Sequence, residues 1–308
     1  MTGASSQRLM DSLMSDESQA AAPLPDEGVY PIREVSRLTG VNAVTLRAWQ
    51  RRYGLVQPAR TEKGHRLYSE QDIRQIGEIL SWLERGVSIG QVKGLLSEPQ
   101  SAPVSDHWQQ TLEQFSQALL AFNQRKAEAE LGDLLASYPF ELVRSRVLQP
   151  LVERLLGLWR ERPDGELLQQ VWLGWLHTRF ARHLIEQEKG VPVTLASWGQ
   201  VGPLDLVWAA YELIGQGYEV QLLGAVEPRH ATLLEGRATP PWLILLGAGL
   251  GKQDQAAEWP EGTRFFGELG RLYDEPWRRA RNWHATLAEV SATPRTAKAK
   301  GKGGRTPS

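Results

Sequence analysis

A short segment rich in arginine constrains this chain more than any other feature. Between Arg47 and Arg66 there are six basic residues and one acidic residue, Glu62, although the whole chain of 308 residues has a formal net charge of -1. The basic residues are Arg47, Arg51, Arg52, Arg60, Lys63 and Arg66. A local excess of this kind favours a polyanionic partner, because a Lys or Arg that meets a phosphate releases a bound counterion.

The residues before and within this segment have the pattern of a helix-turn-helix. Ile32, Val35 and Leu38 recur at the spacing of one helix face. Thr39-Gly40 ends that helix, and Asn42 can cap the next. In the second helix we expect apolar residues to be buried and polar or basic residues to be exposed. The residues expected to be buried are Val44, Leu46, Trp49 and Tyr53, and those expected to be exposed are Asn42, Thr45, Arg47, Gln50, Arg51 and Arg52.

A wing is predicted after the second helix. Pro58 and Gly64 interrupt short extended pieces between Val56 and Tyr68, which is typical of a small hairpin. Basic residues there would meet phosphates, which fixes position and gives salt-dependent affinity but little sequence readout. The wing residues expected on DNA are Arg60, Lys63, His65, Arg66 and Tyr68. Two further helices complete a predicted DNA-binding domain over residues 29–97: Ser69 caps the first, with Asp72 three residues on as in a capping box, and the second follows from Ser88.

These motifs resemble the winged helix-turn-helix of the MerR family. The matching runs are Tyr30–Val35, Thr39–Val41, Thr45–Leu55 and Gly64–Tyr68. The run Leu46–Gly54 is similar to the branch that holds the cobalamin-dependent light sensors of the CarH and LitR types and the MlrA-type curli regulator. The resemblance implies sequence-specific binding of double-stranded promoter DNA as a dimer or higher homo-oligomer, with Thr45, Arg47 and their neighbours in the groove. It also implies activation by DNA distortion or repression by blocking RNA polymerase, with biofilm or extracellular-matrix genes as targets.

The rest of the chain divides by its hydrophobic pattern. Residues 107–189 form four amphipathic helices with short connections, which predicts a bundle, and most of the twelve Trp residues are expected to be packing anchors. After residue 190 we expect strands and helices in an open parallel sheet. The strands are Val191–Trp198, Glu219–Leu223, Trp242–Leu246 and a weaker one at Thr263–Phe266, and the helices cover 204–214 and 276–287.

The predicted fold class is therefore multi-domain, α and α/β. A winged helix-turn-helix comes first, a central four-helix bundle second, and a degenerate Rossmann-like, cobalamin-domain-like open sheet third, over residues 190–290. Polar segments flank these domains: an acidic arm over 1–28, a linker over 98–106 and a basic tail over 291–308. Their composition is too poor in apolar residues to order the arm and the tail.

Positions that hold cobalamin in the resembling family are altered here. That family covers the upper face of the cofactor with a Trp and a later Glu-His pair, and the matching residues are Trp159, Gln169 and Gln170. Its lower axial His falls on Gly202, which has no nitrogen lone pair to give cobalt. We therefore expect no cofactor, and specifically no cobalamin bound by the family mechanism.

Other chemistry is sparse in the sequence. Gly247–Gln253 follows a strand but matches neither a Walker A loop nor a dinucleotide fingerprint, so a turn at the sheet edge is expected. There is no Cys, and the six His residues lack ligand spacing, which predicts no metal site. No nucleophile–His–acid arrangement can be read, so we expect no enzyme. No apolar run reaches the roughly 18 residues of a membrane span, and a cytoplasmic location is expected.

The signal read by the back half is left open by the sequence. One alternative is a DNA-binding receptor for a small ligand, a nucleotide second messenger or another tetrapyrrole. Its pocket would lie near residues 198–204 and 247–251, at the carboxyl ends of the strands. A protein effector, such as a second regulator or RNA polymerase, is the other alternative.

Overall fold

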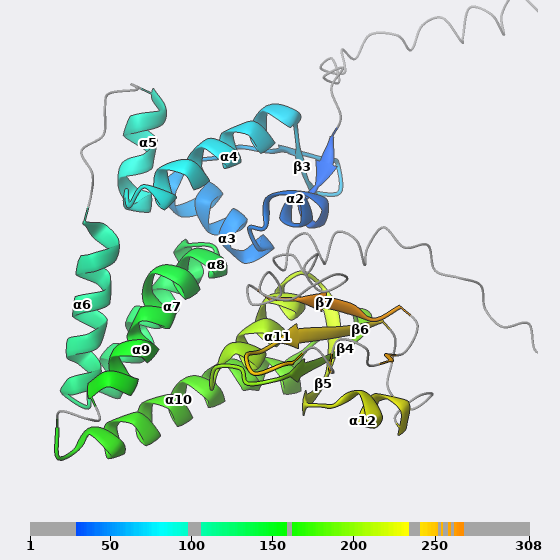
Figure 1. Cartoon of the computed structure of the whole chain (residues 1–308). Coiled ribbons are helices and arrows are strands. Elements are labelled where there is room, and N and C mark those ends of the chain that lie inside the picture. The colour runs from blue at the N-terminus through cyan, green and yellow to red at the C-terminus, as the bar shows by residue number, and fades with distance from the viewer. Residues whose placement is uncertain are drawn as a thin grey trace, which may run out of the picture.

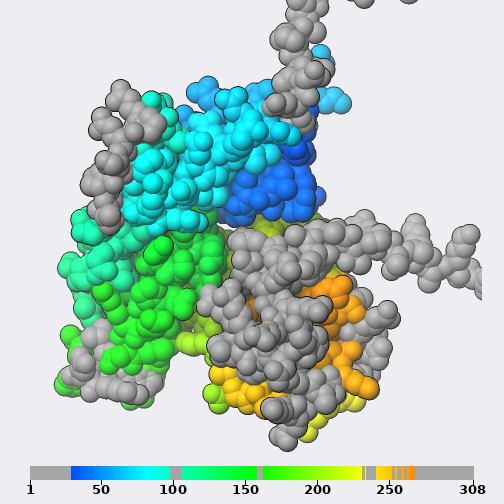
Figure 2. Space-filling model, turned by 45° about the horizontal axis from the view of Figure 1, so that its top comes forward, coloured from blue at the N-terminus to red at the C-terminus, as the bar shows by residue number. Residues whose placement is uncertain are grey.

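The computed structural model describes residues 29–97, 106–158, 162–233, 241–251 and 262–267, together with positions 254, 258 and 259. These residues form an N-terminal head (residues 29–97), a helical bundle and a parallel sheet with helices (Figure 1). Figure 2 shows the head lying directly against the bundle. Most of the predicted arm, linker and tail, and the helix expected at 276–287, lie outside the described residues.

The head has the elements that the sequence predicts for a winged helix-turn-helix. Its helices are α2 (Ile32–Thr39), α3 (Ala43–Ala48), α4 (Glu70–Glu84) and α5 (Ile89–Ser97), and a five-residue π turn, η1 (Trp49–Tyr53), extends α3. The strands β1 (Tyr30–Pro31), β2 (Ala59–Arg60) and β3 (Arg66–Tyr68) form an antiparallel sheet in the order β1-β3-β2.

Two local signals set where the helices of the head begin. The Asn42 side chain accepts a hydrogen bond from the Thr45 backbone N–H at 2.8 Å, which caps α3. Ser69 and Asp72 form a full capping box at the start of α4, because each side chain bonds to the backbone N–H of the other. Both caps confirm predictions made from the residue types alone.

The bundle is built from α6 to α10. The bounds are α6 (His107–Leu120), α7 (Gln124–Ser137), α8 (Phe140–Val143), the π turn η2 (Arg144–Leu148), α9 (Gln149–Leu158) and α10 (Gly165–Glu186). Since α8, η2 and α9 follow one another without a break, they occupy the place of the single third helix that the sequence predicts. In Figure 1, α10 runs along the outer edge of the bundle towards the sheet.

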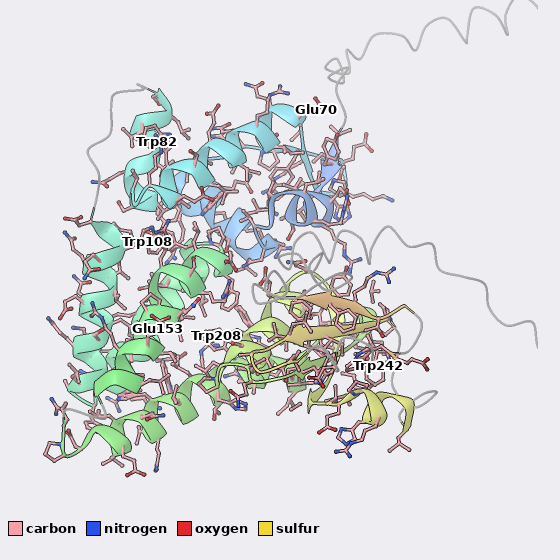
Figure 3. The ribbon with its side chains drawn as sticks, viewed as in Figure 1. Glu70, Trp82, Trp108, Glu153, Trp208 and Trp242 are labelled. Atoms are coloured by element: carbon pink, nitrogen blue, oxygen red, sulfur yellow. The ribbon has the colours of Figure 1, made fainter. Side chains whose placement is uncertain are left out.

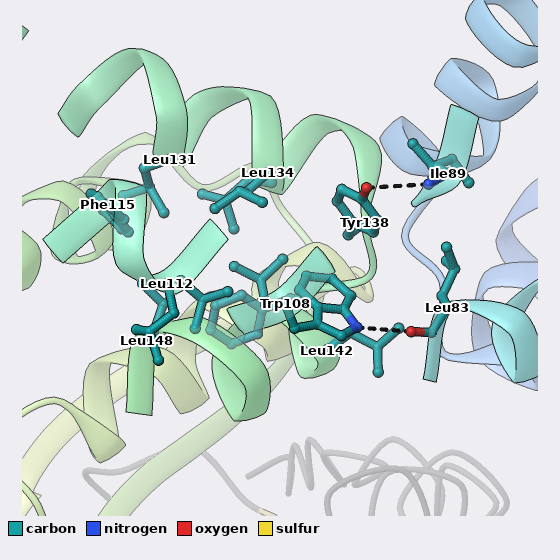
Figure 4. Close-up of a cluster of buried hydrophobic side chains, with 14 of the residues drawn as sticks. Leu83, Ile89, Trp108, Leu112, Phe115, Leu131, Leu134, Tyr138, Leu142 and Leu148 are labelled. Carbon is teal, nitrogen blue, oxygen red and sulfur yellow. Dashed lines mark hydrogen bonds between the residues drawn. The ribbon is translucent and has the colours of Figure 1, made fainter. Parts of the chain in front are cut away.

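One hydrophobic core joins the head to the bundle. The same cluster of buried side chains contains Val35 and Trp49 of the head and Phe115 and Trp172 of the bundle. Figure 4 shows two hydrogen bonds at this joint: the Trp108 indole N–H donates to the Leu83 carbonyl at 2.8 Å, and the Ile89 backbone N–H donates to the Tyr138 hydroxyl at 3.2 Å. Because their core is shared, the head and the bundle should unfold together.

The C-terminal part is an open, parallel, four-stranded sheet. Its strands are β4 (Val191–Trp198), β5 (Tyr218–Ala225), β6 (Trp242–Leu246) and β7 (Arg264–Phe266), in the order β5-β4-β6-β7. The helix α11 (Asp205–Gly215) connects β4 to β5, and a short helix that the sequence does not predict, α12 (Pro228–Leu233), follows β5. The chain order reverses between β4 and β6, which makes the carboxyl ends of these strands the switch point of the sheet.

Candidate DNA-binding surface

The exposed face of the recognition helix is strongly basic. Arg47 lies in α3, and Arg51 and Arg52 lie in the π turn that continues it; all three side chains are exposed. Guanidinium groups on such a helix can reach base edges in the major groove or the phosphates beside it. The three side chains are therefore exposed, as expected, and their contact with DNA stays a prediction.

The wing presents a second basic group next to the helix. Arg60, Lys63 and His65 are exposed around the turn that joins β2 to β3. The turn is closed by a hydrogen bond from the Thr61 N–H to the His65 carbonyl at 2.9 Å, and Gly64 takes the left-handed conformation that it needs, with φ 80°. This arrangement suits phosphate contacts rather than base readout.

A hydrogen bond fixes the wing relative to the recognition helix. The Arg66 guanidinium donates to the Gln50 side-chain carbonyl at 2.6 Å, and both side chains are half-buried. Both residues were expected to contact DNA, but in this structure their side chains are hydrogen-bonded to each other. The bond joins β3 to η1, so it sets the spacing between the two basic groups.

Two of the eleven predicted DNA-binding residues are buried. Thr45 and Tyr68 are both 0% exposed, so the expectation that they face DNA is wrong for this conformation. Val44 is also corrected: it was expected in the core and is 60% exposed. The reason is the phase of α3, because the cap at Asn42 turns Thr45 inward and leaves Val44 on the open face. The positions of Leu46 and Trp49 on the same turn place Thr45 on the buried face of the helix.

The face of α3 and η1 away from solvent is bound to the bundle. The Trp49 indole N–H donates to the Ser137 carbonyl at 2.8 Å, and the Tyr53 hydroxyl lies 3.1 Å from the Ser137 hydroxyl. Half-buried Asn42, which caps α3, and the first two residues of the helix, Ala43 and Val44, line a cavity shared with α10 and α11.

The carboxyl edge of the sheet is closed by its own backbone. Gln200, after β4, and Ala248, after β6, exchange two hydrogen bonds, each 2.8 Å long. Gly247 lies so close to this bridge that a Cβ atom would stand 2.4 Å from the Gln200 carbonyl oxygen. Gly202, at the position of the family's axial His, donates its N–H to the Asp205 carboxylate at 2.8 Å. The two loops thus bind each other across the switch point.

The remaining altered positions lie on α10 or outside the described residues. Gln169 is half-buried and Gln170 is exposed, where its amide donates to Glu166 at 3.3 Å. Trp159 lies outside the described residues. Within the described part of the chain, no three His, Cys, Asp or Glu side chains gather as metal ligands. No helix in that part has the length and apolar character of a membrane span.

A winged helix-turn-helix with arginines on its recognition helix and wing is the head of a DNA-binding protein. Comparison with protein families finds that residues 30–99 match the MerR HTH family regulatory protein model. The chain is 39% identical over 245 residues to the HTH-type transcriptional regulator MlrA of Salmonella typhimurium strain LT2, covering 79% of this chain and 99% of the relative. This protein belongs to the MerR family of transcriptional regulators.

Two further relatives confirm the branch that the sequence resembles. The HTH-type transcriptional regulator MlrA of Escherichia coli K12 is 31% identical over 217 residues, covering 70% of this chain and 88% of the relative. The HTH-type transcriptional repressor CarH of Myxococcus xanthus is 27% identical over 141 residues, covering 41% of this chain and 46% of the relative. All three relatives are named as transcriptional regulators or repressors.

Proposed function

We propose that this protein regulates transcription by binding promoter DNA as a homo-oligomer, with α3 in the major groove and the wing on the phosphates. The observation that carries the proposal is the pair of basic groups on one head. Arg47, Arg51 and Arg52 extend from the recognition helix, and Arg60 and Lys63 extend from the wing. Symmetric partners would place two such heads on half-sites separated by whole turns of the duplex.

The wing residues should control the salt dependence of binding. Removing both charges with Arg60→Ala and Lys63→Ala is expected to lower the slope of log affinity against log salt by about 2, since each phosphate contact contributes about 0.9. The slope is measured by fluorescence anisotropy on genomic fragments that the purified protein selects. Base preference should change little, because these contacts position the head without reading sequence.

A matched control removes the same charge elsewhere. Arg125→Ala with Lys126→Ala takes two cations from the first turn of α7, outside the head, and should leave the slope unchanged. Equal slopes for the wing variant and the wild-type protein would contradict the phosphate role of the wing. The absence of any DNase footprint on selected DNA at every salt concentration would contradict the whole proposal.

The second part of the proposal is that the C-terminal domain works without cobalamin. Gly202 offers no axial ligand, and Gln169 and Gln170 replace the Glu-His pair. The backbone bridge between Gln200 and Ala248 occupies the switch point, where an open sheet would hold a ligand. The residues present therefore do not fit the cofactor that the fold family implies.

A direct binding test follows for the cofactor. After incubation with adenosylcobalamin in the dark and gel filtration, the protein is expected to elute without the visible absorbance of a corrinoid. Its melting temperature should also be unchanged by the cofactor, because a ligand that does not bind the native state cannot stabilise it. Stoichiometric retention of the chromophore would overturn this part of the proposal.

The third part of the proposal concerns what the regulator acts on. The resemblance to the MlrA-type branch implies contact with RNA polymerase and control of biofilm or extracellular-matrix genes. Genome-wide binding sites compared with transcript changes in a deletion strain test both the targets and the sign of regulation. Binding sites that never coincide with changed transcripts would count against a regulatory role.

A further inference from the structure

The open face of the recognition helix is narrow. Of the six residues of α3, Val44 and Arg47 are the two that are exposed. The other four are buried or half-buried: Ala43, Thr45, Leu46 and Ala48. Val44 and Arg47 are three positions apart, so their side chains are neighbours on one face of the helix. The surface that α3 can offer to DNA therefore consists of one guanidinium group and one apolar side chain.

The polar residues expected to read bases from this helix are engaged within the head. The Asn42 side-chain oxygen accepts the capping hydrogen bond from the Thr45 N–H. The Gln50 side-chain oxygen accepts a hydrogen bond from the Arg66 guanidinium. An Asn or Gln that reads adenine presents its oxygen and its amide N–H groups to the base together, and contacts within the head set the orientation of both amides here.

Val44 is open to solvent rather than covered by the neighbouring domains. It borders the cavity between the head and α11, the helix that carries Trp208 in Figure 3, but 60% of its surface stays exposed. Single exposed apolar residues are common on protein surfaces. This one differs by its place, since it lies beside Arg47 on the helix proposed to enter the major groove.

Thymine is the base that offers an apolar partner in the major groove. Its C5-methyl group projects into the groove beside the O4 acceptor, and the other three bases have no methyl group there. An apolar side chain on a recognition helix can pack against this methyl group, which removes apolar surface of both from water. An Arg on the same face can pair with O6 and N7 of guanine.

We propose that Val44 reads a thymine through its C5-methyl group, next to a guanine that Arg47 reads. The inference rests on the proposed function and names the bases that this face selects. Cβ atoms three positions apart on a helix are about 5–6 Å apart. Successive bases of one strand are about 3.4 Å apart along the duplex. The thymine should therefore lie one or two base pairs from the guanine in each half-site.

A methyl scan of the DNA tests the contact without changing the protein. The selected promoter site is synthesised with each thymine replaced, one at a time, by deoxyuridine, which lacks only the C5-methyl group. At one thymine of a half-site, the replacement should weaken binding about 4-fold, the value for exposing one methyl-sized group. Binding is measured by fluorescence anisotropy at a fixed salt concentration, because affinity for DNA depends on salt.

Two variants of Val44 test the protein side of the contact. Val44→Ala should weaken binding to the thymine site about 4-fold or more and abolish the deoxyuridine effect at that position, because the methyl group then has no partner. Val44→Ile keeps an apolar side chain and should keep the deoxyuridine effect. Val171→Ala, on α10 and 40% exposed, is the matched control and should bind both duplexes as the wild-type protein does.

Thermal stability separates the reading of DNA from packing within the protein. Because Val44 is mostly exposed, Val44→Ala should not lower the melting temperature of the full chain. It removes little buried apolar surface, and alanine is the better helix former. A clear fall in the melting temperature would show that Val44 packs against α10 or α11, and it would overturn the reading role.

Two binding results would also overturn the inference: no thymine whose methyl group matters to the wild-type protein, or the same deoxyuridine effect in Val44→Ala. Both leave DNA binding intact, so the proposed function would survive them. A sensitive thymine with no guanine within two base pairs would overturn the shared reading with Arg47. Failure to bind any duplex would instead overturn the proposed function, and this inference with it.

Discussion

Replacing Trp108 with alanine is expected to lower the free energy of unfolding by about 3–5 kcal/mol, the usual loss for a buried Trp. Its ring is 7% exposed and packs edge-to-face against Tyr138 at 4.9 Å, and its indole N–H donates to the Leu83 carbonyl. These contacts join the bundle to the head. The loss is measured by urea denaturation followed by circular dichroism.

A second tryptophan provides the control for this prediction. Trp82 is half-buried on α4, with the Arg85 guanidinium carbon 3.6 Å from the centroid of its ring, and within the described part of the chain its indole makes no hydrogen bond to the bundle. Trp82→Ala should therefore cost clearly less than Trp108→Ala, and the head and bundle should still unfold in one transition. Equal losses for the two variants would contradict the view that Trp108 is an anchor between the two parts.

The elements of the fold could be predicted because their signals are local. The caps at Asn42 and Ser69, the strands Val191–Trp198 and Trp242–Leu246, and the wing follow from residue types within a few positions of one another. The π turn η1 and the junction of α8, η2 and α9 could not be predicted, since a turn of five residues leaves the apolar pattern almost unchanged.

Long-range pairing is the part that the sequence leaves undetermined. Its apolar pattern indicates that Trp49 is buried, but not that its indole N–H donates to the Ser137 carbonyl, 88 residues away. Glu212 is a second example. It follows the buried Trp208 by four residues, and this spacing indicates that it lies on the buried face of α11. The sequence does not indicate that Glu141 and Arg144, which come from the bundle, lie near it.

The sequence predicts which basic residues of the candidate DNA surface are exposed, but not the rotation of α3 about its axis. The exposed guanidinium groups of Arg47, Arg51 and Arg52 are where the residue types placed them. Thr45 was expected to be exposed and is buried, whereas Val44 was expected to be buried and is exposed. The expectation used polarity alone and did not take account of the rotation of about 100° per residue along the helix, which starts at the Asn42 cap.

Arg47→Ala is expected to weaken binding to a selected promoter site by about 1–3 kcal/mol and to reduce discrimination against unrelated DNA. Thr45→Val should leave binding unchanged. The Thr45 hydroxyl is buried without a hydrogen-bond partner among the described residues, so replacing it with a methyl group removes no DNA contact and keeps the shape of the core. Both affinities are measured by anisotropy on the selected site and on a scrambled duplex.

A charge control separates readout from simple attraction. Arg125→Ala removes one cation from α7, on the bundle, and should lower affinity for both duplexes little and equally. If Thr45→Val weakened specific binding as much as Arg47→Ala does, Thr45 would have to face the groove, and α3 would have to turn when it meets DNA. The cap at Asn42 would then have to break on binding, because its hydrogen bond to the Thr45 N–H holds the phase of the helix.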